Sequence, residues 1–208
     1  MTDKAVVNEA EALELLKKLF AEDPALEEKL KRIGGHLYFA DDIVLVVLKG
    51  HLLVEEQLTT IIRKFVPHGE FIDDANLRFF QKVQIARSLS WDEHQNDMWD
   101  LVIGLNKVRN DMAHALEHPK VEAHISSLRA CYFEIFADSE RAKAEKDARD
   151  ADVLKSVVVV LTGFLAQFEK EVERFRWWVS IIDRFVNPHR HRQPKAAGRV
   201  DTADVESQ

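Results

Sequence analysis

The strongest constraint on the fold is a long apolar stripe near the end of the chain, from Leu154 to Phe185. Large apolar side chains recur there at steps of three and four residues, which predicts one side of a single long helix. They are Val158, Leu161, Leu165, Phe168, Val172, Phe175, Trp178, Ile182 and Phe185. Such a stripe has to be covered by the core of a helical domain or by a second copy of the chain. We therefore expect Trp177 and Trp178 to serve packing rather than base stacking.

Composition favours an all-α fold around this helix. The chain has 208 residues, of which 46% are hydrophobic and 31% are charged, enough for one medium-sized core. It contains 7 Gly and 5 Pro, few for a protein built on tight β-turns. The sequence predicts a helical bundle of about five to seven helices without a sheet. One domain is expected over residues 1–187, followed by a disordered tail at 188–208.

Caps and helix breakers divide the rest of the domain into further helices. Ser90 and Glu93 fit a capping box at the start of the central helix, and Pro119 is expected to end that helix. The charged run at 138–152 is expected to be a partly ordered link. The predicted helices are two peripheral ones within 1–35 (6–20, then one from Asp23-Pro24 to Gly34-Gly35), a spine from Asp41 to Phe65, one capped by Asp73-Asp74 that runs to Leu89, a central helix from Trp91 to Leu116, one from Val121 to Phe136, and the long helix at 153–186.

Cysteine usage, the N-terminus and the net charge bound the environment of the protein. Cys131 is the single cysteine, so no intramolecular disulfide can form, and a cytoplasmic location is expected. The N-terminus lacks a basic region followed by an apolar core, and no apolar run approaches the ~20 residues needed to cross a bilayer. We therefore expect neither export nor a membrane span. A net charge of −7 argues against binding to duplexes through a broad basic surface.

Several common enzyme chemistries have no support in the sequence. It contains no G-x-x-x-x-G-K-[ST] loop, no C-x-x-C pair, no H-E-x-x-H helix and no G-x-S-x-G elbow. The 9 histidines are scattered, and no pair has metal-ligand spacing with a carboxylate on the same face. Neither a metal nor another cofactor is expected.

The stretch from Leu101 to His118 combines an apolar face with reactive polar residues. Leu101, Leu105, Val108 and Met112 form the face that a helix would bury, while Asn106, Arg109, Asn110 and His114 lie on the adjoining flank. Arg109 and His114 are separated by about 140° of rotation and about 7.5 Å of rise. Because helical side chains lean toward the N-terminus, His114 leans toward Arg109, and a phosphate fits between them.

His51 and Glu55 interrupt the apolar stripe of the spine helix. They are spaced i, i+4, so their side chains can meet on the helix surface. One interpretation is a core histidine that is satisfied by Glu55 or by a backbone carbonyl. The other places Glu55 or Glu56 beside Arg109 as its orienting carboxylate.

The arrangement R-N-D-M-A-H, from Arg109 to His114, resembles the R-x4-6-H motif of the HEPN superfamily. Arg63 to His68 and Arg184 to His189 have the same spacing, but Pro67 and Pro188 interrupt the helix in both. The wider pattern L-N-x-x-R-N-x-x-A-H, with Asn directly after Arg, is a form that such proteins often take. The upstream K-G-H-L-L-V-E-E-Q-L looks like the preceding family helix. The resemblance covers residues 41–136.

This resemblance implies an all-α protein whose active relatives are metal-independent endoribonucleases, often dimeric with a shared cleft, and many of them toxins or phage-defence effectors. His114 would move the proton of a ribose 2′-hydroxyl, and Arg109 would hold the phosphate, leaving a 2′,3′-cyclic phosphate. Asn106 and Asn110 would position the phosphate, and Asp111 would orient His114. The expected partners are RNA, a second copy of the chain, and an antitoxin or regulatory protein.

Two alternatives to the enzyme stay open from the sequence. A histidine near a helix C-terminus is stabilised by the last carbonyls, and an arginine one turn earlier can pair with a glutamate of a neighbouring helix. The motif then belongs to a non-catalytic HEPN-like dimeric module with a regulatory or binding role. An unrelated helical protein is the other alternative.

Overall fold

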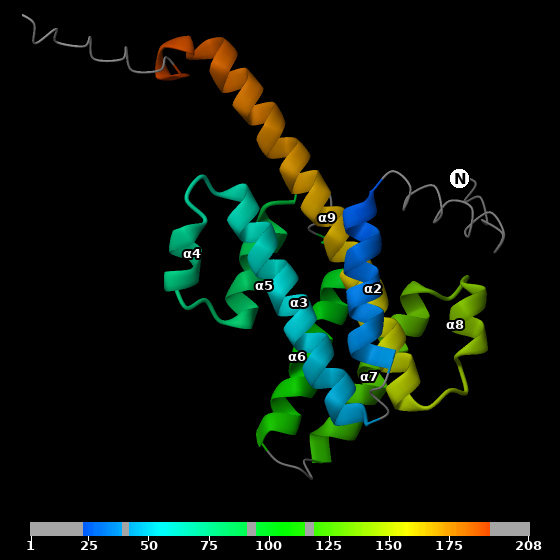
Figure 1. Cartoon of the computed structure of the whole chain (residues 1–208). Helices are drawn as coiled ribbons and strands as arrows, with labels where there is room; N and C mark the ends of the chain where they lie inside the picture. Colours follow the sequence, from blue (N-terminus) through cyan, green and yellow to red (C-terminus); the bar gives the residue numbers. More distant parts are fainter. Residues whose placement is uncertain (1–22, 39–41, 91–94, 115–118, 192–208) are drawn as a thin grey trace, which may run out of the picture.

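The structure is a computed structural model that describes residues 23–38, 42–90, 95–114 and 119–191. Within these ranges it is all-α, as predicted, with eight α-helices, one 3-10 helix and no strand (Figure 1). Two of the α-helices are single short turns, so six longer helices form the bundle. The elements are α2 (Pro24–Tyr38), α3 (Ile43–Phe65), α4 (Glu70–Asp74), α5 (Phe79–Ser88), α6 (Met98–His114), α7 (Pro119–Ile135), α8 (Glu140–Ala144), α9 (Asp150–Val186) and η2 (Pro188–His191).

Helix α3 is the spine of the bundle. It contacts α2, α4, α5, α6 and α9, with its most extensive packing against α9 (Figure 1). Asp42 starts it by accepting a hydrogen bond from the Val44 N–H at 2.7 Å. Its apolar positions Val47, Val54, Leu58 and Ile61 are all fully buried, so the amphipathic pattern of the sequence faces the core as predicted.

The contact between α3 and α9 depends on a glycine. A Cβ added at Gly50 would overlap the Val158 side chain, so only a residue without a side chain lets the two helices approach this closely. Further along α9, Trp99 of α6 meets Phe164 and Phe168 edge-on, with ring centroids 5.2 and 5.6 Å apart. Edge-to-face packing of this kind joins α6 to the same core.

Ion pairs attach α2 to this core. Glu169 of α9 is only 3% exposed and binds Lys29 of α2 at 2.5 Å as well as Lys64 of α3. Burial raises the pKa of the Glu169 carboxyl, but the hydrogen bonds from the two lysines outweigh it, and the pKa lies below its usual value. Lys170 also binds Asp23, the residue before α2, at 2.5 Å. The seam among α2, α3 and α9 is therefore held by charge as well as by apolar packing.

Several predicted helix boundaries are wrong. Helix α2 runs through Gly34-Gly35 to Tyr38, because Ile33 and Leu37 are buried and their packing outweighs the low helix propensity of glycine. Asp73-Asp74 close the short α4 instead of capping the next helix, and Gln81 accepts the Arg78 N–H at the start of α5.

The central helix also differs from its prediction at its start, while its predicted end at Leu116 lies outside the described residues. It begins at Met98 rather than at Trp91, because the Asn96 side chain accepts the Met98 N–H at 2.9 Å. Pro119 is the first residue of α7, a position that proline favours. Glu93 of the proposed capping box and the helix predicted at 6–20 lie outside the described residues. The tail predicted at 188–208 is wrong over its first four residues, because Pro188–His191 form η2, and its remainder also lies outside the described residues.

The C-terminal part of α9 extends beyond the bundle (Figure 1). Its buried residues end at Val172, while Trp177 and Trp178 are 57% and 53% exposed. These tryptophans are therefore not part of the core of the single chain, and the expectation that they serve packing, here in a seam with a second copy, stays a prediction. Among the described helices, α9 is long and apolar enough to cross a membrane by length and composition alone, and 61% of its most apolar window is buried within the fold.

The glycine at the crossing of α3 and α9 gives a test of this packing. Gly50→Ala should lower the free energy of unfolding by about 1–3 kcal/mol, because the new methyl group forces Val158 out of its position. Chemical denaturation followed by circular dichroism measures this change.

Gly163→Ala is the matched control, since it lies in the same helix as Val158 and its added Cβ meets nothing within 4 Å. It should raise stability by about 0.5–1 kcal/mol, the usual gain from replacing a helical glycine. Equal effects of the two substitutions would contradict the close approach.

Candidate functional site

Helix α6 presents the polar flank that the sequence predicts. Leu101, Leu105 and Val108 are fully buried and Met112 is half-buried, which fixes the rotation of the helix. With that face in the core, Asn106, Arg109, Asn110 and Asp111 are half-buried along the edge that borders α3 and α7.

His51 of α3 lies against this flank and is only 5% exposed. Its Nε2 is 3.1 Å from Oδ1 of Asn106, and its ring stacks on Phe79 of α5 with centroids 4.3 Å apart at 27°. Three helices thus meet around one imidazole. In the neutral tautomer that carries a proton on Nε2, this nitrogen donates to the Asn106 oxygen.

The other ring nitrogen of His51 faces a carboxylate. Nδ1 is 3.8 Å from Oε2 of Glu55, and Oε1 of the same carboxylate binds Nζ of Lys82 at 2.8 Å. The i, i+4 meeting of His51 and Glu55 is therefore as predicted, whereas the hydrogen-bond partner of the ring is Asn106 rather than a backbone carbonyl. Glu55 is held by Lys82 of α5, a residue that the sequence interpretation did not include.

The pKa of His51 lies below its ordinary value of about 6.5. Burial is the largest cause, because a charged imidazolium would lose its hydration. The hydrogen bond to Asn106 and the negative charge of Glu55 raise the pKa, and the positive charges of Arg109 and Lys82 lower it. At neutral pH His51 is uncharged.

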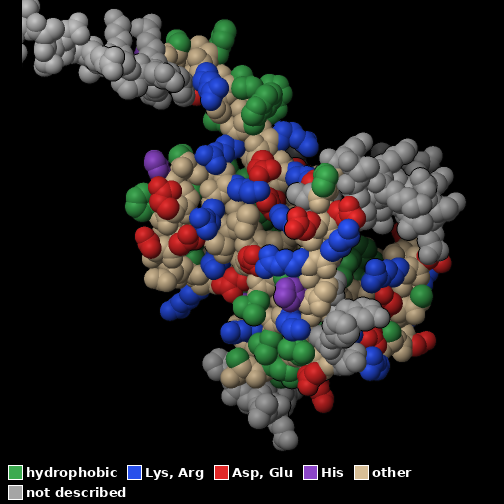
Figure 2. Space-filling view, in the orientation of Figure 1, with side chains coloured by type: hydrophobic (Ala, Val, Ile, Leu, Met, Phe, Trp, Pro, Cys, Tyr) green, Lys and Arg blue, Asp and Glu red, His purple; other side chains and the backbone are tan. Residues whose placement is uncertain are grey.

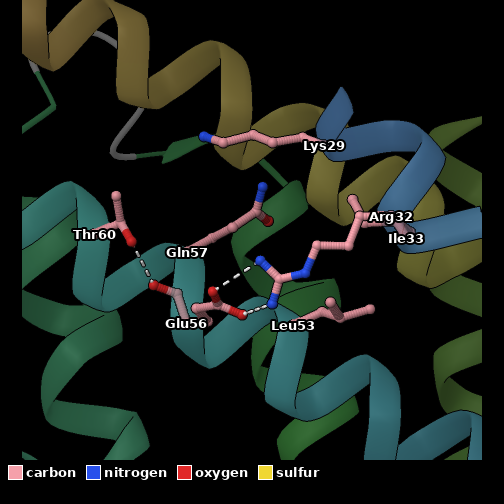
Figure 3. Close-up of a pocket in the computed structure, with 7 residues that line it drawn as sticks. All are labelled: Lys29, Arg32, Ile33, Leu53, Glu56, Gln57 and Thr60. Atoms are coloured by element: carbon pink, nitrogen blue, oxygen red, sulfur yellow. Dashed lines mark hydrogen bonds and ion pairs between the residues drawn. The ribbon is translucent and has the colours of Figure 1, made fainter. Parts of the chain in front are cut away.

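Arg109 lies near His51 and is half-buried, and its Nη1 donates to Oδ1 of Asn110 at 3.2 Å. Glu56 does not serve as its orienting carboxylate. Arg32 of α2 binds both oxygens of Glu56, at 3.1 and 2.8 Å, beside a small pocket between α2 and α3 (Figure 3). One helical step of about 100° separates Glu56 from Glu55 and turns it toward α2.

Asp111 binds the imidazole Nδ1 of His124 on α7. The contacts of Asp111 therefore do not support the expectation that it orients His114, because its carboxylate pairs with His124 instead. His124 was missed in the sequence, although a signal exists. In two consecutive helices that pack together, residues about equally far from the connection lie side by side. Asp111 lies three residues before the end of α6, and His124 lies five residues after the start of α7.

His114 is the last residue of α6, and its side chain lies outside the part of the structure that is described. The helix continues unbroken from Arg109 to His114, as predicted. The other two motifs of the same spacing do not lie on one helix. For Arg63 to His68, α3 ends at Phe65, and for Arg184 to His189, α9 ends at Val186. Only the motif of α6 stays on one described helix.

No protein-family model, curated protein or solved structure matches the chain. The resemblance to the HEPN superfamily therefore stays a prediction from the motif and its helical context. Among the described side chains, no group of three histidine, cysteine or acidic residues is arranged to hold a metal ion.

The buried imidazole gives a prediction about stability and pH. Because its pKa is lower in the folded protein, the unfolded chain binds more protons below about pH 6.5, and the free energy of unfolding falls as the pH falls from there. Between pH 7 and pH 5, His51→Gln should show a smaller loss than the parent protein. The difference in slope is at most about 1.4 kcal/mol per pH unit, the value for one proton. Denaturant titrations at several pH values measure it.

His68→Gln is the control, because the His68 side chain is 74% exposed and its ring contacts the exposed side chains of Glu70 and Phe71. It should leave the slope unchanged. A slope that His51→Gln does not alter would show that another group controls the acid sensitivity.

Proposed function

We propose that the chain is a metal-independent endoribonuclease of the HEPN type, with Arg109 and His114 as its catalytic residues. The observation that carries the proposal is the unbroken course of α6 through the R-N-D-M-A-H motif, with the stripe of Leu101, Leu105 and Val108 turned into the core. This rotation leaves Arg109 on a half-buried flank, next to two side-chain amides and a histidine. Such a flank can desolvate part of a bound phosphate without burying it.

The proposed chemistry assigns one role to each group. Arg109 binds the scissile phosphate with two parallel N–H donors, and its attraction for the phosphate grows as negative charge develops. His114 removes the proton of the 2′-hydroxyl, whose oxygen attacks the phosphorus. The bond from phosphorus to the 5′-oxygen breaks, that oxygen takes a proton from water to become the 5′-hydroxyl, and His114 returns its own proton to solvent. Asn110, which already accepts a hydrogen bond from Arg109, fixes the direction of the guanidinium. The products are a 2′,3′-cyclic phosphate and a 5′-hydroxyl.

The buried cluster around His51 has a supporting role in this proposal. A neutral His51 adds no positive charge beside Arg109, and it holds Asn106 one turn before Arg109 on the same helix. The pair of Lys82 and Glu55 closes the far side of the ring. We assign to His51, Glu55 and Asn106 the positioning of α6, and neither Glu56 nor Asp111 has a proposed role in catalysis.

RNA would be held by these few residues rather than by a basic surface. Figure 2 shows Lys and Arg side chains interspersed with Asp and Glu over the visible face, in keeping with the net charge of −7. The proposal includes a cytoplasmic location, a homodimer, and a toxin or phage-defence role with an antitoxin or regulatory protein as partner.

A second candidate function is a non-catalytic HEPN-like module that binds or regulates a partner. The observation that favours it is the internal pairing of the flank, where Asp111 binds His124, Asn110 accepts from Arg109, and Asn106 bonds to His51. Groups that are satisfied within the fold support its packing, and an absence of RNA cleavage by the pure protein would favour this candidate.

The ribonuclease proposal is tested by incubating purified protein with mixed RNA in the presence of EDTA. Cleavage should proceed in the chelator and yield 2′,3′-cyclic phosphate ends. His114→Ala and Arg109→Ala should each slow it by about 100-fold or more, since each removes a group that acts in the transition state. The melting temperature should change little, because neither residue belongs to the stripe of Leu101, Leu105 and Val108.

Arg63→Ala and Arg184→Ala are the matched controls. Each arginine begins a motif of the same spacing, but Arg63 binds Asp73 at 3.2 Å and Arg184 lies on the extended part of α9. Both variants should cleave RNA at the parental rate. Full activity of Arg109→Ala, or unfolding of His114→Ala, would remove the basis of the proposal.

A further inference from the structure

The extended end of α9 carries an unusually large apolar surface. Figure 1 shows this part of the helix projecting from the bundle, and Figure 2 shows hydrophobic side chains gathered on it. Seven large apolar side chains there are 39% to 88% exposed, and they are Trp177, Trp178, Val179, Ile181, Ile182, Phe185 and Val186. We refer to residues 177–186 as the projecting segment.

The exposure follows from the unequal lengths of two packed helices. Phe175 of α9 stacks on Phe65, the last residue of α3, with ring centroids 6.2 Å apart. Arg176 then donates to the Lys64 carbonyl at 2.5 Å. Helix α9 continues to Val186, whereas the chain at the end of α3 turns away at Pro67. Among the described elements, the short η2 (Pro188–His191) contacts α9, and in Figure 1 none of the other helices of the bundle extends as far as the end of the projecting segment.

The apolar side chains of the projecting segment cover most of the helix circumference. At about 100° per residue, the arc from Trp177 to Val179 that contains all seven spans about 200°. A helix that packs on one core needs an apolar stripe of only about 100°. Solvent exposure on this scale is unfavourable, and so the segment has the pattern of a helix that another surface covers.

The exposed area is large enough for a stable dimer. The seven exposed fractions add up to about four whole side chains, or roughly 700 Å² at the size of large apolar side chains. A standard protein interface buries about 800 Å² on each partner. The largest apolar patch of a typical monomer is about 300–600 Å².

We propose that the projecting segment binds the same segment of a second copy of this chain. In a twofold pair each helix covers the apolar arc of the other, so both surfaces are buried by one contact. Trp178 and Ile182 lie near the middle of the arc, one turn apart, and form the centre of the interface. This proposal is independent of the ribonuclease proposal.

A membrane is a poorer match for the same surface. The ten residues of the projecting segment rise about 15 Å, half of the ~30 Å of a bilayer core. Asp183 and Arg184 lie within it, and most of the apolar window of α9 is already buried in the bundle. The net charge of −7 also opposes adsorption to anionic lipid.

The proposed pairing separates the two candidate sites. In Figure 1 the projecting segment and the C-terminal end of α6 lie at opposite ends of the molecule. A contact made only between the projecting segments therefore contains no residue of the candidate site and does not by itself bring the Arg109 of the two chains together. A dimer can therefore form at the projecting segment without the shared cleft that the HEPN resemblance implies.

The test is the mass of the full chain in solution. At micromolar concentration, light scattering after size exclusion should give about twice the 24.0 kDa of one chain. The double variant Trp178→Glu with Ile182→Glu should run at the mass of one chain, because self-association weakens by at least about 100-fold when charge enters the centre of an apolar interface. Its circular dichroism should be unchanged, and its melting temperature should not depend on protein concentration, whereas that of the parent dimer should.

Leu48→Glu with Leu52→Glu is the matched control. These leucines are 39% and 64% exposed, are also spaced i, i+4, and form part of a smaller apolar patch on α3. This variant should stay dimeric. A monomeric control together with a dimeric Trp178→Glu, Ile182→Glu variant would move the interface to α3 and overturn the proposal.

Fluorescence gives a second measurement. Trp99 is fully buried, whereas Trp177 and Trp178 change environment on pairing, so dilution of the parent protein should shift emission to longer wavelength. The double variant should show no dependence on concentration. A parent protein that is monomeric in scattering, or that instead sediments with vesicles of phosphatidylcholine and phosphatidylserine, would overturn the proposal.

Discussion

The close approach of α3 to α9 at Gly50 determines where the rest of the chain can lie. Helix α3 contacts five other helices, so its depth against α9 sets their positions as well. His51 follows Gly50 directly and lies about 100° further around the helix. The Val158 side chain packs against Gly50 on one side of α3, and His51 hydrogen-bonds to Asn106 on another side. The geometry of the candidate site therefore depends on an apolar contact that contains none of its residues.

The candidate site places ionisable side chains where burial disfavours their charged forms. Four ionisable side chains, His51, Glu55, Lys82 and Arg109, lie close enough to influence one another, and the imidazole is nearly inaccessible to solvent. Such an arrangement is stable only if each buried polar group has a partner. The imidazole meets this condition by staying neutral, while Glu55 is paired with Lys82. The guanidinium of Arg109 stays half-buried, so it keeps access to an external anion.

The sequence predicts those features that depend on one helix and misses those that depend on two. The stripe of α9, the buried face of α6 and the meeting of His51 with Glu55 all follow from helical periodicity. The bonds of Lys82 and His124 join residues on different helices, and no local pattern fixes them. The continuation of α2 through Gly34-Gly35 has the same origin, because burial of Ile33 and Leu37 against the core outweighs local propensity. The HEPN resemblance concerns a local motif, and so the fold alone does not decide it.

The double pairing of Glu169 has a consequence for how the fold opens. A buried carboxylate that loses its only partner costs several kcal/mol, which would tie the release of α2 to general unfolding. Glu169 binds lysines from both α2 and α3, so Lys64 remains when Lys29 leaves. Helix α2 is further held by exposed or half-exposed pairs such as Arg32 with Glu56, which dissolved salt weakens. Ionic strength therefore acts on the charged part of the α2 seam, whereas the burial of Ile33 and Leu37 against the core does not depend on it.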